Sequence, residues 1–529
     1  MLRWLHLIHR WLGIALGLLV LAWLVSGLVM LFVARPKLQE DERLQGLHEL
    51  PATQGLLSPG QAWAGLGLSE PPKALRLQNQ ALGPVYLFQL GQQWRAVDAR
   101  SGLPRGPVGA EFALAQAREH AGLRQGRAQA LSLDQWTVYG SFNAQRPFYR
   151  VEFDDAAGLE IYVAQASGEV VLDTDGAERA LNWVGSVLHW LYFTPLRQQG
   201  ALWGQVVVWS SGVAAAMVLL GMVLGVQRLR LRRRYAGGRI TPYRAQTHAW
   251  QRWHHLGGLA AGIVLLVWLL SGWLSMRPFG LLDGKSDPAG LKAEQQAFSG
   301  GPLEPARLNL PSLPSEAGWK ELEALRFDGR DYWLARSPQR VLLLDAGGQV
   351  LPLGLGEAEL LSLASKLKPA HRIASAGWLH EPDLHYYPHR HSSRALPVYR
   401  VIFDDAQHTA FYIDPQRARL AQRVDESSRN YRWLFNAAHR WDFPPLSALG
   451  LPRDALVIVL TLLCSGVASA GVVLGWRRLK SSPRPSAYAG PPPEGAAMPG
   501  GSTARHIASA GRLGAARRSA RNQGDHQHE

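Results

Sequence analysis

The sequence predicts an α-helical membrane protein with α+β extramembrane domains, and two observations support this fold class. Apolar residues are concentrated in four long runs that are separated by polar segments. The chain also contains one series of motifs twice, in the same order. We therefore expect four transmembrane helices in two parallel tandem repeats, each made of a helix, a large insertion and a second helix.

Each apolar run is long enough to cross a hydrocarbon core of about 30 Å as a helix. The expected transmembrane helices lie at residues 1–34, 201–227, 254–276 and 454–476. The first run carries no charge from Leu12 to Val33, which is too long for the apolar part of a signal peptide. No small-residue cleavage site follows it, so we expect this helix to be retained.

Basic residues set the expected orientation in the membrane. The loop at 228–253 is rich in arginine, and Arg477 and Arg478 follow the last run. Short basic loops face the cytoplasm, so both termini should be cytoplasmic in a bacterial inner membrane. The insertions at 35–200 and 277–453 would then be periplasmic. The net charge of +15 reflects this topology and a basic tail, and no motif indicates nucleic-acid binding.

The remaining composition limits the chemistry. Residues 477–529 are rich in Pro, Gly, Ala, Ser and Arg without apolar periodicity, which predicts a disordered cytoplasmic tail. Cys464 is the single cysteine, so the chain can form neither an internal disulfide nor a thiolate cluster. No nucleophile elbow or zinc-protease motif supports a hydrolase.

The internal repeat is the most informative feature. The segment Arg150–Asp155 recurs as Arg400–Asp405, at an offset of 250 residues. Further matches at this offset pair Trp183, His189, Gly221 and Gly225 with Trp433, His439, Gly471 and Gly475. Between the first and third runs the offset is 245, pairing His9, Gly13, Gly17, Trp23, Ser26 and Gly27 with His254, Gly258, Gly262, Trp268, Ser271 and Gly272. A duplication with a pseudo-two-fold axis along the membrane normal explains these matches, and the small residues would let helices approach closely.

Each insertion reads as two small α+β modules. In the first insertion the pattern predicts a helix at Glu111–His120 and strands at Tyr149–Phe153 and Glu160–Val163. Interfacial helices are expected at 179–193 and 428–441, directly before the second and fourth membrane helices.

Four histidines are matched across the repeat: His9 with His254 near the inner face, and His189 with His439 near the outer face. Polar residues at membrane depth are costly and usually functional, and imidazole is a common axial ligand of haem iron. A pseudo-two-fold axis would bring each pair together, which predicts two bis-histidine sites for haem b. Ligation within one copy remains open, and so do simpler roles as snorkelling or aromatic-belt residues. His6 and His255 lack histidine counterparts and are weaker candidates.

A second polar cluster lies in the second insertion. Tyr387, His389 and His391 are candidate contacts for an iron chelate or a haem propionate, and an extended backbone would place both histidines on one face. The alternative is a polar surface loop. The first copy has Tyr139 and Ser141 at the matching positions, so such a site would not be duplicated.

Three segments carry a resemblance to a known family. They are the run His9-Arg10-Trp11-Leu12-Gly13 with the later Ser26-Gly27, the stretch Tyr386–His391, and Trp433–His439. Over nearly the whole chain to about residue 480, the sequence resembles the PepSY-associated transmembrane family. The resemblance implies periplasmic PepSY-like domains, b-type haem between the helices, and reduction of ferric iron in a chelate such as a siderophore. Reduction would release the metal because hard oxygen ligands hold Fe(II) more weakly.

The expected function is therefore a ferric-chelate reductase embedded in the lipid bilayer. The loop at 227–253 and the tail show no dinucleotide fingerprint, so electrons must come from a separate flavin reductase or from quinol. Two alternatives stay open. One is a non-enzymatic PepSY protein that regulates or binds an envelope partner, and the other is a chelate transporter, for which a homodimer would supply more helices.

Overall fold

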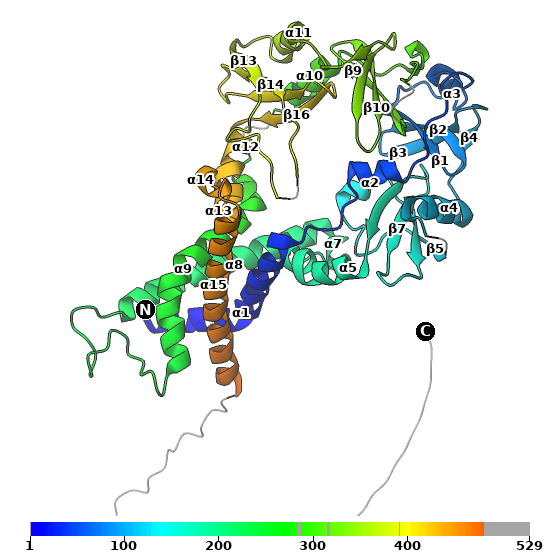
Figure 1. Ribbon diagram of the computed structural model, residues 1–529. Coiled ribbons are helices and arrows are strands. Elements are labelled where there is room, and N and C mark those ends of the chain that lie inside the picture. Colours follow the sequence, from blue (N-terminus) through cyan, green and yellow to red (C-terminus); the bar gives the residue numbers. More distant parts are fainter. Residues whose placement is uncertain (1, 124, 284–286, 315–317, 391, 481–529) are drawn as a thin grey trace, which may run out of the picture. The chain divides into compact units, whose positions relative to one another are not determined.

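The computed structural model describes residues 2–123, 125–283, 287–314, 318–390 and 392–480 (Figure 1). Most of the tail expected at 477–529 lies outside the described residues, because the last described helix ends at Lys480.

Within the described residues, four helices are long and apolar enough to cross a membrane: α1 (Leu2–Phe32), α8 (Gly200–Arg228), α9 (Ala249–Ser275) and α15 (Leu451–Lys480). These four helices and the sheets of the insertions confirm the predicted membrane fold with α+β domains. The helices continue past the apolar runs, so α9 begins at Ala249 rather than 254 and α15 at Leu451 rather than 454. Hydropathy marks only the apolar part, whereas helical hydrogen bonding continues into the polar flanks.

The four helices form a bundle (Figure 1). Helix α1 packs against α8 and α15, and α9 packs against the same two helices. Apolar side chains from all four fill its centre, including Val20, Ala214, Leu265 and Cys464. Gly262 permits a close approach, because a Cβ atom there would lie 2.9 Å from Cγ of Met222 on α8.

The described part of the first insertion contains eight strands and several short helices. The strands are β1 (Ala74–Gln80), β2 (Gly83–Leu90), β3 (Gln93–Asp98), β4 (Pro104–Arg105), β5 (Gly126–Leu131), β6 (Phe148–Phe153), β7 (Glu160–Ala164) and β8 (Val170–Thr174). The helices are α2 (Glu40–Gln45), α3 (Pro59–Ala64), α4 (Ala110–Ala121), α5 (Gly176–Asn182), α6 (Leu188–Trp190) and α7 (Thr194–Arg197), with a 3₁₀ turn η1 (Gly140–Phe142) and a π-helical turn η2 (Trp183–Val187).

From its first strand onward, the second insertion has the same succession of strands and α-helices. Its strands are β9 (Glu321–Phe327), β10 (Arg330–Arg336), β11 (Val341–Asp345), β12 (Val350–Leu351), β13 (Ile373–Leu379), β14 (Val398–Phe403), β15 (Ala410–Asp414) and β16 (Arg419–Val424). Its helices are α10 (Pro288–Ser299), α11 (Glu357–Leu367), α12 (Glu426–Tyr431), α13 (Ala438–Arg440) and α14 (Pro444–Ser447), with the 3₁₀ turns η3 (Pro278–Gly280) and η4 (Pro305–Arg307) and a π-helical turn η5 (Arg432–Ala437).

Two of the sheets are four-stranded and antiparallel, each with strands in chain order. In the sheet β5-β6-β7-β8, alternate residues such as Val151 and Ile161 point to one face and pack against Ala113 and Ala117 of α4. The sheet β13-β14-β15-β16 packs in the same way against α11, through Val401, Phe403 and Leu363.

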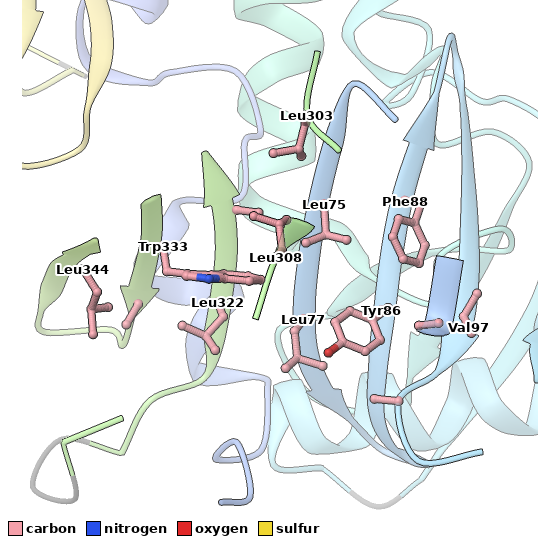
Figure 2. Close-up of a cluster of buried hydrophobic side chains, with 14 of the residues drawn as sticks. Leu75, Leu77, Tyr86, Phe88, Val97, Leu303, Leu308, Leu322, Trp333 and Leu344 are labelled. Atoms are coloured by element: carbon pink, nitrogen blue, oxygen red, sulfur yellow. The ribbon is translucent and has the colours of Figure 1, made fainter. Parts of the chain in front are cut away.

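The third sheet joins the two insertions. Strands β1–β4 and β9–β12 form one eight-stranded antiparallel sheet, in which β1 pairs with β9 through Leu75–Ala324 and Leu77–Leu322. Figure 2 shows the apolar side chains of both insertions, among them Leu75, Leu322 and Trp333, forming one core over this sheet. The sequence analysis did not anticipate this pairing between the two insertions. Without this pairing, β1 and β9 would each be the exposed edge strand of a four-stranded sheet. Because they pair with each other, neither edge is exposed.

A buried ion network lies at the same junction. The carboxylate of Glu321 on β9 is fully buried, with Arg43 Nη1 at 2.8 Å and Arg336 Nη1 at 2.7 Å. Gln78 on β1 also donates a hydrogen bond to it, at 2.5 Å. Burial alone would raise the pKa of Glu321, but the guanidinium groups of Arg43, Arg76 and Arg336 hold that pKa well below its usual value. The carboxylate is therefore ionised and links the two insertions.

Candidate functional site

Two of the predicted histidines lie close together in the bundle, near the N-terminal ends of α1 and α9. His9 lies on α1 and His254 lies on α9, which are each in contact with α8 and α15. Their imidazole centroids are 6.2 Å apart and the ring planes are inclined by 36°. The structure thus brings together the inner pair that the repeat predicted.

Backbone carbonyl groups determine which ring nitrogen of this pair carries the proton. His9 Nδ1 lies 3.1 Å from the carbonyl oxygen of Met217 on α8, and His254 Nδ1 lies 3.1 Å from that of Val467 on α15. A carbonyl oxygen can only accept a hydrogen bond, so Nδ1 is the donor in each ring. Nε2 of both rings consequently keeps a free lone pair, as in histidines that bind metals.

The other two predicted histidines form a second pair. His189 lies on α6 and His439 on α13, with ring centroids 6.1 Å apart and an interplanar angle of 65°. Nδ1 of His189 lies 3.2 Å from the carbonyl oxygen of Trp23, and Nδ1 of His439 lies 3.1 Å from that of Trp268. The same protonation argument applies, so this outer pair also has its Nε2 atoms free of protons.

Two serine hydroxyls give the outer pair a second acceptor. Ser26 Oγ lies 3.0 Å from Nδ1 of His189, and Ser271 Oγ lies 3.1 Å from Nδ1 of His439. Ser26 donates its own proton to the Trp23 carbonyl oxygen at 3.1 Å, so its oxygen accepts from the imidazole.

A glycine makes room for each of the four rings. A Cβ atom would stand 2.6 Å from Cε1 of its histidine at Gly221, 3.1 Å at Gly471, 3.4 Å at Gly27 and 3.2 Å at Gly272. Each glycine lies four residues after the carbonyl that accepts the imidazole proton, so one helical turn supplies both the acceptor and the space. Their roles were missed, although the repeat matches both glycine pairs.

The helices that carry the outer pair differ slightly from expectation. They run from Gly176 to Trp190 and from Glu426 to Arg440, instead of 179–193 and 428–441. Each contains a π-helical turn immediately before its last turn. Each ends where Leu191 or Trp441 takes a left-handed conformation, with φ of 52° and 54°, two residues after the histidine.

The weaker candidates have other surroundings. His255 is buried and both of its ring nitrogens have partners, Thr241 Oγ1 and the Gly225 carbonyl oxygen, each at 2.8 Å. It is therefore not available as a ligand. His6 lies 2.8 Å through Nδ1 from the carbonyl oxygen of Leu2 in its own helix. Among the described residues, no group of three or more His, Cys, Asp and Glu side chains is placed to hold a metal ion.

The candidate substrate contacts lie in the connection between β13 and β14. Tyr387 donates a hydrogen bond to Asp442 Oδ2 at 2.9 Å, and His389 Nδ1 lies 3.4 Å from the same oxygen. Asp442 follows His439 by three residues, so this connection contacts the chain beside the outer pair. Burial would raise the pKa of Asp442, but the bonds from His389 and Tyr387 lower it. The expected extended segment is instead a turn closed by a bridge between His389 and Ser392, and His391 lies outside the described residues.

A cavity of about 460 Å³ lies next to this connection. It is lined by Ala34, Arg35, Lys37, Gln39, Ser392 and Ser393. Arg35 stacks on the ring of Tyr139, 4.5 Å from its centroid. The lining residues carry two positive charges and no negative charge, so the cavity suits an anion.

Comparison with known protein families matches residues 6–478 to the PepSY-associated TM region. Four apolar helices, the insertions between them and this match over most of the chain define a multi-pass membrane protein. The chain belongs to the PepSY-associated transmembrane family, which confirms the resemblance seen in its sequence. No curated protein matched it.

Proposed function

We propose that this protein is a haem-containing electron-transfer protein of the bacterial inner membrane that reduces ferric chelates on the periplasmic side. The observation that carries the proposal is the pairing of His9 with His254 and of His189 with His439. All four imidazoles donate Nδ1–H to a backbone carbonyl, which leaves the Nε2 lone pair of each ring free.

The spacing within each pair fits two imidazoles that would together hold one haem iron. Two metal–imidazole bonds of about 2 Å, together with the ring radii, require centroids roughly 6 Å apart. The observed separations are 6.2 Å and 6.1 Å. At Gly13, one helical turn beyond His9, none of the described residues lies within 4 Å of a Cβ position, so this side of α1 is open. Gly13 therefore makes no close helix contact of the kind its sequence pattern suggested.

The two pairs lie at different heights of the bundle. On α1, His9 and Ser26, which contacts His189, are 17 residues apart, or about 25 Å of helix. This is close to the thickness of a hydrocarbon core of about 30 Å. Haem bound at both pairs would supply one-electron chemistry near each face of the membrane. We attribute the matching contacts of the two halves to an internal duplication.

The residues of this chain hold and orient the ligands. The carbonyl groups of Met217 and Val467 fix the inner rings, and those of Trp23 and Trp268 fix the outer rings. Hydrogen bonds from Nδ1 increase the basicity of Nε2 and prevent ring rotation.

The ferric chelate would bind on the periplasmic side, close to the outer pair. The cavity that contains Arg35 and Lys37 favours anionic chelates, and Tyr387 and His389 lie in the connection that contributes Ser392 to it. The arginine-rich C-terminal ends of α8 and α15 support a cytoplasmic location for the end of the bundle that carries His9 and His254. The electron donor would be a separate flavin reductase or quinol.

An optical spectrum of the detergent-purified protein tests this function. We expect a Soret band, sharp α and β bands after dithionite, and about two haems per chain. Leucine substitution of His9 or His254 should empty the same site, and substitution of His189 or His439 should empty the other. His255→Leu is the control, since both nitrogens of His255 are already occupied. A colourless protein from haem-replete cells would contradict the proposal and favour the binding or regulatory alternative.

A further inference from the structure

The loop between α8 and α9 is folded against the bundle. Arg230 N donates to the Ile240 carbonyl oxygen at 2.9 Å, and Tyr235 pairs with Arg239 in a short bridge. Thr241 binds Nδ1 of His255, whose Nε2 binds the Gly225 carbonyl of α8. These contacts give the loop a defined conformation, which a loop serving only as a charged topology signal does not require.

This loop lines an open cavity of about 630 Å³. Its lining includes the guanidinium-bearing residues Arg239, Arg244 and Arg252, together with Gly237 and Gly238. Both glycines have positive φ, 76° and 72°, and nothing lies within 4 Å of a Cβ position at either. The backbone at the turn is therefore open to a ligand.

The segment that contains this loop supplies no negative charge of its own. Between Glu178 and Asp283 the sequence contains no Asp or Glu. Arg239 donates through Nε to the Ala236 carbonyl oxygen at 2.9 Å, but its Nη1 atom is buried without a hydrogen-bond partner in the described structure. A buried guanidinium donor without an acceptor is costly, so a missing acceptor is the simplest explanation.

We propose that this cavity binds a phosphate-bearing anion. Arginine is suited to phosphate because its planar donors match two phosphate oxygens. The positive-inside rule accounts for Arg232 and Arg233, which are exposed and do not line the cavity, but it does not require arginines to converge on one space. The phosphate is that of an anionic lipid headgroup or of a soluble phosphate compound.

Two probes separate these sources, using the full chain in lipid nanodiscs. Phosphatidylglycerol mixed into phosphatidylcholine nanodiscs tests the lipid, with retention measured by native mass spectrometry. Inorganic pyrophosphate added to pure phosphatidylcholine nanodiscs tests the soluble ligand, with binding measured by calorimetry. Neither readout depends on haem, so the result stands apart from the proposed function.

The decisive comparison is between two double variants with equal loss of charge. We expect R239Q/R244Q to weaken binding of the effective probe about tenfold or more, whereas R232Q/R233Q leaves it within about twofold. The single variant R244Q should also weaken binding of the effective probe. Because Arg244 is exposed, this substitution is not expected to disturb folding, so a loss of binding cannot be ascribed to misfolding. Equal losses in both double variants would show general attraction to a basic face and overturn the proposal, as would saturable binding of neither probe.

Discussion

Gly221 on α8 lies directly against the imidazole of His9, where a Cβ atom would stand 2.6 Å from the ring carbon Cε1. The same ring donates to the Met217 carbonyl oxygen one turn earlier. A single turn of α8 therefore provides both the space for the His9 ring and the acceptor of its hydrogen bond.

The substitution Gly221→Ala should displace His9 from the Met217 carbonyl. Because the bundle is closely packed, the added methyl group also costs about 1–3 kcal/mol of stability. We expect the haem content of the purified protein to fall from about two per chain to about one. Gly204→Ala on the same helix is the control, because nothing lies within 4 Å of a Cβ atom there. An unchanged haem content in Gly221→Ala would contradict the assignment of His9.

Removing one acceptor from the outer pair should change its reduction potential without loss of haem. In Ser26→Ala, His189 keeps only the Trp23 carbonyl oxygen as an acceptor, so Nε2 becomes less basic and Fe(II) is favoured. In a redox titration, we expect the midpoint potential of the haem proposed at the His189–His439 pair to rise by an amount on the order of 10 mV. Ser211→Ala is the matched control, since that hydroxyl bonds only to Val207 and Val208 of its own helix. A shift of the inner site, or of neither site, would argue against this role.

The junction between the insertions should be sensitive to loss of Glu321. Glu321→Ala leaves Arg43 and Arg336 without their buried partner and should cost about 3–5 kcal/mol. The expected result is a clear fall in the melting temperature in detergent. Glu70→Ala changes an exposed carboxylate and should leave the melting temperature nearly unchanged.

Acid should weaken the same junction. The pKa of Glu321 is lowered in the folded protein from its usual value of 4.5, so its contribution is complete above that pH and is lost as the pH falls toward the folded pKa. The melting temperature of the wild type should therefore decrease below about pH 4.5 more steeply than that of Glu321→Gln. Parallel curves for the two proteins would show that Glu321 does not carry this dependence.

The outer cavity should control the reaction with anionic chelates. In the double variant R35Q/K37Q the lining loses both positive charges. Stopped-flow oxidation of the reduced protein by an anionic ferric chelate should slow by about tenfold and become less sensitive to salt. The variant K73Q, an exposed lysine of the same insertion, should react like the wild type. Equal rates in all three proteins would place the chelate elsewhere.

The sequence was sufficient for the membrane helices and for the pairing of the four histidines. Uninterrupted apolar runs leave few alternatives to helices in lipid, and the offsets of 245 and 250 residues match His9 to His254 and His189 to His439. The carbonyl partners were not predictable, because every residue has a carbonyl group and only helix packing selects Met217 and Val467. The glycines at 221 and 471 offered a signal, since a matched glycine often marks a close approach.

The joint sheet was also missed. The strand β1 reads as an ordinary half-buried strand, and nothing in its side-chain pattern names β9 as its neighbour. The buried Gln78 and Glu321, which face each other across that pairing, would look like surface residues in either strand alone. The turn at His389 was missed because its conformation depends on Asp442, more than fifty residues away.

The sheet shared by β1 and β9 has a mechanical consequence for the membrane helices. A carrier that exposes a site alternately to each side rocks its two halves about a hinge, and here such rocking would pull against a continuous ladder of backbone hydrogen bonds. The ionised Glu321 and its arginines add further contacts at the same junction, so the two insertions are joined both by backbone hydrogen bonds and by buried ion pairs. A junction of this kind would suit the electron-transfer protein that we propose, in which the distance between two haem sites stays fixed, better than a transporter that needs large movements.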